Sequence, residues 1–222
     1  MQSLATLLNG SPLLPIIQTE QVQDAVAIAQ AMQQGGVVAV EVVLRNASAL
    51  QAISAIREQV PELLVGAGTI LSKAQALDAK AAGAQFLVSP ASPRELLEAM
   101  IATDLPLAPG VSTATEMAAA VAMGLTELKF FPAHLSGGPA MLQAVRSIYP
   151  QVRFCPTGGV SLSNLADYLR LQNVFVVGGS WLTPASNGLA IASDAYLSQV
   201  REITQASLEK AASAVQPLQQ SA

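Results

Sequence analysis

An apolar and partly aromatic stretch near the middle of the chain contains one lysine: Glu127-Leu128-Lys129-Phe130-Phe131-Pro132-Ala133. If this stretch is a β-strand, Lys129 and Phe131 point to one face, because side chains alternate along a strand. A lysine buried without a partner tends to become a neutral nucleophile, since burial of an unpaired ammonium is costly. The alternative is an ordinary lysine near a strand end, whose amine reaches out to water. The stretch therefore predicts a buried strand and leaves both roles open for its lysine.

Similar apolar strands alternate with helical patterns along the rest of the chain. Strands are expected over 13–18, 37–43, 63–69, 85–89, 105–109, 127–133, 153–156 and 174–177. Helices are expected over 1–9, 21–34, 48–59, 73–82, 93–103, 113–123, 139–147, 163–171 and 194–212. Eight consecutive strand–helix units predict one (β/α)₈ TIM barrel. An open doubly wound sheet usually has a glycine-rich turn after its first strand, and Gln18-Thr19-Glu20 has no glycine.

The chain is expected to form a single domain over residues 1–222. The helix over 1–9 would cap one end of the barrel, and the polar segment 216–222 is expected to be a flexible tail. Of the 222 residues, 51% are hydrophobic and only 4% aromatic, which suits buried parallel strands packed by helices.

The composition also limits the partners. No apolar run reaches the roughly 18 to 20 residues of a membrane span, and no signal peptide is recognisable, so we expect a soluble, cytoplasmic protein without a membrane partner. The net charge of -4 comes without a basic patch, which argues against nucleic acid as a partner. An anionic ligand would have to be held by local groups.

His134 and Cys155 are the single histidine and the single cysteine. A Ser-His-Asp relay or a metal site built from several histidines would depend on His134 alone, which follows Pro132-Ala133 in an apparent loop. If the protein performs carbon–carbon bond chemistry, we therefore expect it to use an amine rather than a zinc ion. Cys155 has no partner for an internal disulfide and is expected to be a buried strand residue.

Active sites of such barrels lie at the carboxyl ends of the strands. The second strand ends in Glu41-Val42-Val43-Leu44-Arg45, and alternation places Glu41 and Arg45 on one side if the extended conformation continues. A local ion pair at a strand end is the alternative. The third strand ends in Gly66-Ala67-Gly68-Thr69, where small residues let a ligand approach the backbone and Thr69 offers a hydroxyl.

Prolines and glycines mark the remaining strand ends. Pro90 and Pro109 end the fourth and fifth strands and are interpreted as mainly structural. Thr157-Gly158-Gly159 and Gly178-Gly179-Ser180 follow strands seven and eight, where barrels often bind phosphate through free backbone N–H groups. Ordinary glycine turns are the alternative.

Taken in order, these motifs resemble one family, the class I aldolases that cleave 2-keto-3-deoxy-6-phosphogluconate (KDPG) and often also act on 4-hydroxy-2-oxoglutarate (KHG). The resemblance covers essentially the whole chain. Its most specific parts are Glu41 with Arg45, 65–69, 129–133, 153–159 and 178–181.

The resemblance implies a (β/α)₈ barrel, a homotrimer, and catalysis through a lysine imine without a metal or other cofactor. It implies that Lys129 is the Schiff-base lysine and Glu41 the acid–base group. The substrate would be a phosphorylated 2-keto sugar acid. The groups that bind it would be Arg45 and Thr69 for the carboxylate, Pro90 and Phe131 for the pocket wall, and Thr157, Gly158, Gly159, Gly179 and Ser180 for the phosphate.

Three positions depart from the family pattern. Val43 stands where the family commonly has threonine, Ala91 where it often has glycine, and His134 where it often has an acidic residue. None of the three removes a group that the chemistry requires, and each could shift substrate preference.

Three alternatives remain open. The first is the same chemistry on another 2-keto acid, such as the galactonate epimer or unphosphorylated KHG. The second is a phosphosugar isomerase or epimerase barrel that forms no imine. The third is a binding barrel without turnover, which the joint presence of Lys129, Glu41 and Arg45 argues against.

Overall fold

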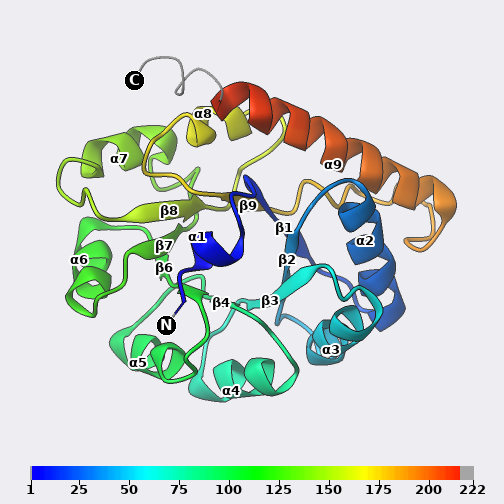
Figure 1. Ribbon diagram of the computed structural model, residues 1–222, viewed down its shortest axis with the longest axis horizontal. Helices are drawn as coiled ribbons and strands as arrows, with labels where there is room; N and C mark the ends of the chain where they lie inside the picture. Colours follow the sequence, from blue (N-terminus) through cyan, green and yellow to red (C-terminus); the bar gives the residue numbers. More distant parts are fainter. Residues whose placement is uncertain (1, 216–222) are drawn as a thin grey trace.

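The computed structural model describes residues 2–215. Figure 1 shows a curled sheet at the centre of the molecule with helices around its outside. The strands are β1 Leu13–Ile17, β2 Ala39–Val43, β3 Leu64–Gly68, β4 Leu87–Val88, β5 Leu107–Ala108, β6 Gly110–Val111, β7 Glu127–Phe130, β8 Arg153–Pro156 and β9 Val177–Gly179. The helices are α1 Leu4–Leu7, α2 Val22–Gln34, α3 Ala49–Gln59, α4 Lys73–Ala81, α5 Arg94–Ile101, α6 Ala114–Ala122, α7 Gly138–Val145, α8 Leu165–Leu169 and α9 Asp194–Val215.

All strand pairings recorded for the described residues are parallel. Six strands pair in the order β5-β4-β3-β2-β1-β9, and three pair in the order β6-β7-β8. The two sheets are continuous along the chain at Pro109, where β5 gives way to β6, and a parallel bridge joins Thr157 to Gly178 between β8 and β9. The strands therefore form a curled parallel wall whose carboxyl ends share one rim.

Local signals begin several of the outer helices. Thr113 caps α6: its hydroxyl accepts the Glu116 N–H, and the Glu116 carboxylate accepts the Thr113 N–H in return.

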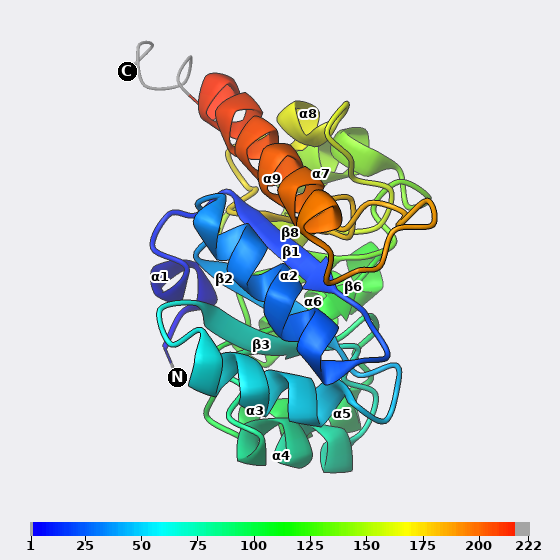
Figure 2. The same cartoon turned by 90° about the vertical axis from the view of Figure 1, so that its right-hand side faces the viewer.

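The long helix α9 packs beside α2 and α8 (Figure 2). Gly35 at the end of α2 permits this close approach, because a Cβ there would lie 2.7 Å from Thr204 Cγ2 of α9.

Apolar side chains fill both sides of the strands. A large cluster lies between the strands and the outer helices, as expected where amphipathic helices cover parallel strands. A smaller cluster contains Phe86, Val88, Cys155 and Val176 together with Leu4 and Leu8 of the α1 segment. This segment therefore covers the amino-terminal end of the sheet (Figure 1).

A buried carboxylate attaches α1 to the sheet. Glu127, the first residue of β7, accepts hydrogen bonds from Ser3 Oγ at 2.6 Å and from the Leu4 N–H at 2.6 Å. Arg153 of β8 pairs with the same carboxylate at 2.5 Å. The helix predicted over 1–9 is thus the short helix Leu4–Leu7, and it does cover one end of the strands.

The structure corrects three sequence-based boundaries. The expected strand 105–109 is two short strands separated by Pro109, which has no N–H for the ladder. The expected last strand 174–177 instead pairs over Val177–Gly179, which places Gly178 and Gly179 inside the strand. The last helix continues past 212 to Val215. The predicted flexible tail 216–222 lies outside the described residues.

Within residues 2–215, none of the helices combines the length and the apolar character needed to cross a membrane.

Candidate active site

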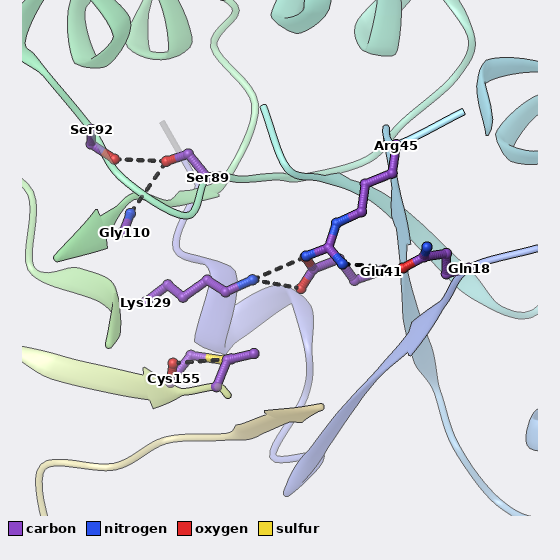
Figure 3. Close-up of polar contacts among 9 residues, drawn as sticks. Gln18, Glu41, Arg45, Ser89, Ser92, Gly110, Lys129 and Cys155 are labelled. Atoms are coloured by element: carbon purple, nitrogen blue, oxygen red, sulfur yellow. Dashed lines mark hydrogen bonds and ion pairs between the residues drawn. The ribbon is translucent and has the colours of Figure 1, made fainter. Parts of the chain in front are cut away.

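Lys129 and Glu41 meet inside the curled sheet. Lys129 is on β7 and Glu41 on β2, and their exposed fractions are 4% and 0%. Lys129 Nζ lies 3.0 Å from Glu41 Oε1 and 3.4 Å from Oε2. Figure 3 shows the two side chains extending toward each other from different strands. The expected reactive lysine is therefore buried, and it has a carboxylate within proton-transfer distance.

The lysine does not reach out to water. With 5% of its side chain exposed and a buried ion-pair partner, Lys129 does not fit the snorkelling alternative. The sequence suggested an amine among apolar neighbours without a charged partner. The recorded charged partner is instead a carboxylate, so the resting site is an ion pair.

Gly68 makes room for the carboxylate. It ends β3, and a Cβ at this position would lie 1.9 Å from Glu41 Oε1. No side chain other than hydrogen fits there unless Glu41 moves. The sequence identified the small residues of this strand end, but interpreted them as space for a ligand.

Phe131 connects the ion pair to a pocket at the rim. Lys129 Nζ lies 5.6 Å from the centre of the Phe131 ring, within the range of a cation–π contact. The same ring lines a pocket of about 140 Å³. The residues lining this pocket are Ile16, Gln18, Arg45, Phe131, Thr157, Gly158, Gly159, Val160, Gly179 and Ser180.

The pocket thus brings together all five residues of the predicted phosphate site with Arg45 and Phe131. Gly158 and Gly159 have φ of 93° and 80°, a backbone conformation that glycine adopts readily. A Cβ at Gly158 would also lie 3.2 Å from the Phe131 ring. The glycines after β8 therefore serve both the turn and the pocket wall. Ser180 is exposed at the rim.

Thr157 lies deeper than the glycines that follow it. Its side chain is 2% exposed, and its hydroxyl lies 3.4 Å from the Cys155 carbonyl oxygen. A Cβ on Gly178 would lie 2.4 Å from this hydroxyl, so Gly178 is needed for close packing of β8 and β9. Any contact from the Thr157 hydroxyl to a ligand would be at the bottom of the pocket.

Cys155 is a fully buried strand residue, as predicted. Burial raises the pKa of its thiol to about 12, and the charge of Lys129 opposes this rise. The thiol therefore remains protonated at neutral pH and is a poor nucleophile.

Arg45 does not continue the alternation of β2. The strand ends at Val43, and the Arg45 N–H bonds to the Val43 carbonyl oxygen at 2.9 Å, which turns the chain. The extended conformation on which the predicted placement of Glu41 and Arg45 depended therefore ends at Val43, although Arg45 still lines the rim pocket. Arg45 is exposed, and its Nη1 donates to Gln18 Oε1 at 3.1 Å (Figure 3).

Thr69 and Pro90 are close to the site without lining the pocket. Thr69 directly follows β3 with φ of 58° and is half-buried. Pro90 is half-buried after β4, and a Cβ at Gly110 would lie 2.3 Å from its backbone. Ser89, beside Pro90, is fully buried and accepts the Gly110 N–H at 3.2 Å (Figure 3). This hydroxyl joins β4 to the start of β6.

A larger hollow of about 410 Å³ lies at the other end of the strands. It is lined by residues of the α1 segment together with Arg153, Gln172, Val174 and Phe175. Neither Lys129 nor Glu41 borders it. The pocket at the carboxyl rim is the smaller one, but it is the one connected to the buried amine.

No group of three or more His, Cys, Asp or Glu side chains is placed to hold a metal ion in the part of the chain that the structure describes. His134, the single histidine, is exposed, and its N–H bonds to the Gly158 carbonyl oxygen at 3.0 Å.

Comparison with known proteins assigns the family. The family model for KDPG and KHG aldolase matches residues 4–195. The chain belongs to the KDPG and KHG aldolase family. A KHG/KDPG aldolase from Escherichia coli is 46% identical over 183 residues, which is 82% of this chain and 86% of the relative. A 2-dehydro-3-deoxy-phosphogluconate aldolase from Pseudomonas aeruginosa is 42% identical over 205 residues, or 92% of this chain and 91% of the relative.

A solved structure within this aldolase family shares the fold. It is a KDPG aldolase from Legionella pneumophila, with pyruvate captured as a covalent carbinolamine intermediate. The two chains are 40% identical with a TM-score of 0.85, and the match covers 91% of this chain and 96% of the other.

Sequence reasoning missed two members of the site in this aldolase chain. Gln18 lines the rim pocket and contacts Arg45, although the expected first strand ended at this very residue. The strand-end rule that selected Glu41 and Thr69 would have selected Gln18 too. Gly68 was recognised as small, but its contact with Glu41 depends on strand register, which the sequence does not give.

Proposed function

We propose that this chain is a class I aldolase that cleaves 2-dehydro-3-deoxy-6-phosphogluconate to pyruvate and glyceraldehyde 3-phosphate. The observation that carries the proposal is the buried 3.0 Å contact between Lys129 and Glu41, in a chain of the KDPG and KHG aldolase family. Cleavage of 4-hydroxy-2-oxoglutarate to pyruvate and glyoxylate is a second candidate activity, favoured by the name of the Escherichia coli relative.

Lys129 begins the reaction as the nucleophile. A proton passes from Nζ to the Glu41 carboxylate across their hydrogen bond, which leaves a neutral amine. The amine adds to the C2 keto carbon and gives a carbinolamine. Glu41 returns its proton to the hydroxyl group of this intermediate, which leaves as water. This step gives an iminium, which can accept the electron pair of a breaking bond, and it restores the Glu41 carboxylate.

Glu41 then acts as the general base. Its carboxylate takes the proton of the C4 hydroxyl, through a water, and the C3–C4 bond breaks. The aldehyde leaves as glyceraldehyde 3-phosphate, and the electron pair moves to C3 to form an enamine on Lys129. Return of a proton to C3 and hydrolysis of the iminium release pyruvate and the free amine. The chemistry uses the covalent imine and calls for no metal.

The two ends of the substrate have separate partners in this proposal. Arg45 and Thr69 bind the carboxylate, for which a guanidinium is suited because its N–H groups match a planar oxyanion. The phosphate is bound by Gly158, Gly159, Gly179 and Ser180, with Thr157 below them. Support comes from the rim pocket, which these five residues line together with Arg45. Phe131 and Pro90 form the wall between the two ends.

We further infer that residues 1–222 form a single domain whose curled sheet closes as a (β/α)₈ barrel, with β5 and β6 counting as one strand. The bridge between Thr157 and Gly178 supports closure at the other seam. We also infer a homotrimer, in line with the family resemblance.

Reductive trapping tests the imine directly. Protein incubated with pyruvate and then reduced with borohydride should carry one adduct, which peptide mass spectrometry should locate on Lys129. Lys80, which donates to the Thr103 carbonyl oxygen away from this site, should stay unmodified. The Lys129→Arg variant should give no adduct and no cleavage. Absence of an adduct in well-folded wild-type protein would contradict the proposal and favour an isomerase or epimerase without an imine.

Substrate preference is tested by comparing cleavage rates. We expect KDPG to be cleaved with a higher kcat/KM than unphosphorylated KHG, because only a phosphorylated substrate can use both the carboxylate-binding and the phosphate-binding residues. We expect the same order for KDPG over its galactonate epimer, because the epimer differs from KDPG in stereochemistry. A higher kcat/KM for KHG would reverse the order of the two candidate activities.

A further inference from the structure

Gln18 comes from the strand between the two ends of the proposed substrate site. In the six-stranded sheet, β1 pairs with β2 on one side and with β9 on the other. Arg45 follows β2, and Gly179 belongs to β9. Gln18 directly follows β1, so its side chain lies between the residue proposed to bind the carboxylate and those proposed to bind the phosphate.

Arg45 has one recorded anchor. Its Nη1 donates to Gln18 Oε1, and no other side-chain hydrogen bond or ion pair of Arg45 is recorded among residues 2–215. The turn after Val43 releases Arg45 from the regular strand. A guanidinium has five N–H donors, so a single bond to Gln18 leaves the others free for a carboxylate.

An anchor of this kind affects binding through entropy. An arginine side chain has considerable rotamer entropy, part of which is lost whenever it is fixed on a ligand. A group already held in place before binding loses less. Both Gln18 and Arg45 are exposed at the mouth of the site, so this contact is not explained by core packing.

We propose that Gln18 is a positioning residue that holds the Arg45 guanidinium ready for the substrate carboxylate. The inference rests on the proposed function, in which Arg45 binds that carboxylate. It concerns the pyruvate half of the substrate, which is common to phosphorylated and unphosphorylated substrates.

The Gln18→Leu variant tests the proposal because it removes the acceptor and keeps similar bulk. A net hydrogen bond of about 0.5 to 1.5 kcal/mol predicts a rise in KM of about 2- to 12-fold. The rise should be the same for KDPG and for KHG, since both carry the carboxylate, and kcat should change little. The matched control is Gln23→Leu on α2, an exposed glutamine without a recorded side-chain hydrogen bond in the described chain, which should leave both constants unchanged.

A double-mutant cycle separates positioning from direct contact. In an Arg45→Ala background, Gln18→Leu should have almost no further effect on KM, because the group that it positions is gone. A full effect in that background would mean that Gln18 contacts the substrate itself. An unchanged KM in the single variant, or a rise confined to the phosphorylated substrate, would equally overturn the proposal.

Reductive trapping with pyruvate distinguishes this failure from failure of the proposed function. If wild-type protein forms no adduct, both the proposed function and the positioning role of Gln18 are refuted. If wild-type forms the adduct and Gln18→Leu needs no more pyruvate for half-maximal trapping, the aldolase stands and the role of Gln18 is refuted. Matching thermal unfolding of Gln18→Leu and Gln23→Leu controls for loss of folding.

Discussion

Lys129 and Glu41 approach each other from strands that are not neighbours in the sheet order. Each alone would be an expensive buried charge, and together they satisfy one another. The pair can also supply a reactive amine, because transfer of one proton from Lys129 to Glu41 yields a neutral amine and a neutral acid. A merely structural ion pair would not require a ligand pocket beside it, yet Phe131 contacts this amine and lines one.

Glu41→Gln should separate turnover from imine formation. The amide keeps the shape of the carboxylate but cannot accept a proton, so kcat for cleavage should fall by about 10²- to 10⁴-fold. Borohydride trapping of pyruvate should remain detectable, since Lys129 is still present. Steady-state kinetics and peptide mass spectrometry on the same preparation give both readouts. An unchanged kcat would show that another group is the base.

Gly68→Ala should impair catalysis through Glu41. The added Cβ would lie 1.9 Å from Glu41 Oε1, so the carboxylate must move away from its present position. Because Gly68 is not among the glycines with positive φ, the backbone itself tolerates alanine. Displacement of a catalytic group by about 1 Å can cost up to about 10²-fold in rate, and we expect kcat to fall within that range.

Gly66→Ala on the same strand is the matched control. The added Cβ would lie 2.1 Å from the ring of Phe86, which belongs to the smaller apolar cluster described above. Overpacking of this kind typically costs about 1 to 3 kcal/mol, or about 2 to 12 °C in Tm for a chain of this size. Gly66→Ala should therefore lower Tm more than Gly68→Ala does, and reduce kcat less. The reverse order would contradict the role of Gly68.

At the scale of elements, the strands and helices follow from hydrophobic periodicity, and the sequence places nearly all of them. The errors occur where hydrogen bonding decides. Pro109 splits the fifth strand because it lacks an N–H, and the second strand ends before Arg45 because the chain turns at Val43. Alternation predicts which face of the sheet a side chain occupies. It does not predict where strand pairing ends, or which residues of neighbouring strands lie side by side. The contacts of Gln18 and Gly68 depend on that register, so the sequence could not predict them.

The attachment of α1 to β7 through Glu127 should contribute to the stability of the fold. Glu127→Gln should weaken the hydrogen bonds from Ser3 and Leu4 and the ion pair with Arg153. Hydrogen bonds to a charged group contribute about 1.5 to 3 kcal/mol, so Tm should fall by about 3 to 12 °C. The variant should be followed by thermal unfolding with circular dichroism.

An exposed ion pair on another helix provides the comparison. Glu98 pairs with Arg94 on α5 at 2.9 Å, but the two side chains are 54% and 84% exposed. Such pairs contribute at most about 1 kcal/mol, so Glu98→Gln should change Tm by less than about 4 °C. Equal losses for Glu98→Gln and Glu127→Gln would mean that α1 adds no stability through this carboxylate.

At the scale of the whole molecule, the described surface retains several large apolar side chains. Leu135 is 82% exposed, Ile148 64% and Leu71 60% in the single chain. Scattered apolar residues are normal on a monomer, so they do not by themselves identify an interface. Exposed apolar side chains do permit association between copies of the chain, and homo-oligomers usually form closed cyclic assemblies.

The inferred homotrimer predicts a definite mass in solution. One chain has a mass of 22.9 kDa, so light scattering coupled to gel filtration should give about 69 kDa. The value should hold when the protein is diluted across the micromolar range, because an obligate interface does not dissociate there. A mass near that of one chain would refute the trimer while leaving the imine chemistry intact, since Lys129 and Glu41 belong to the same chain. A dimer or tetramer would refute it too, and would imply an interface different from the one that the family resemblance leads us to expect.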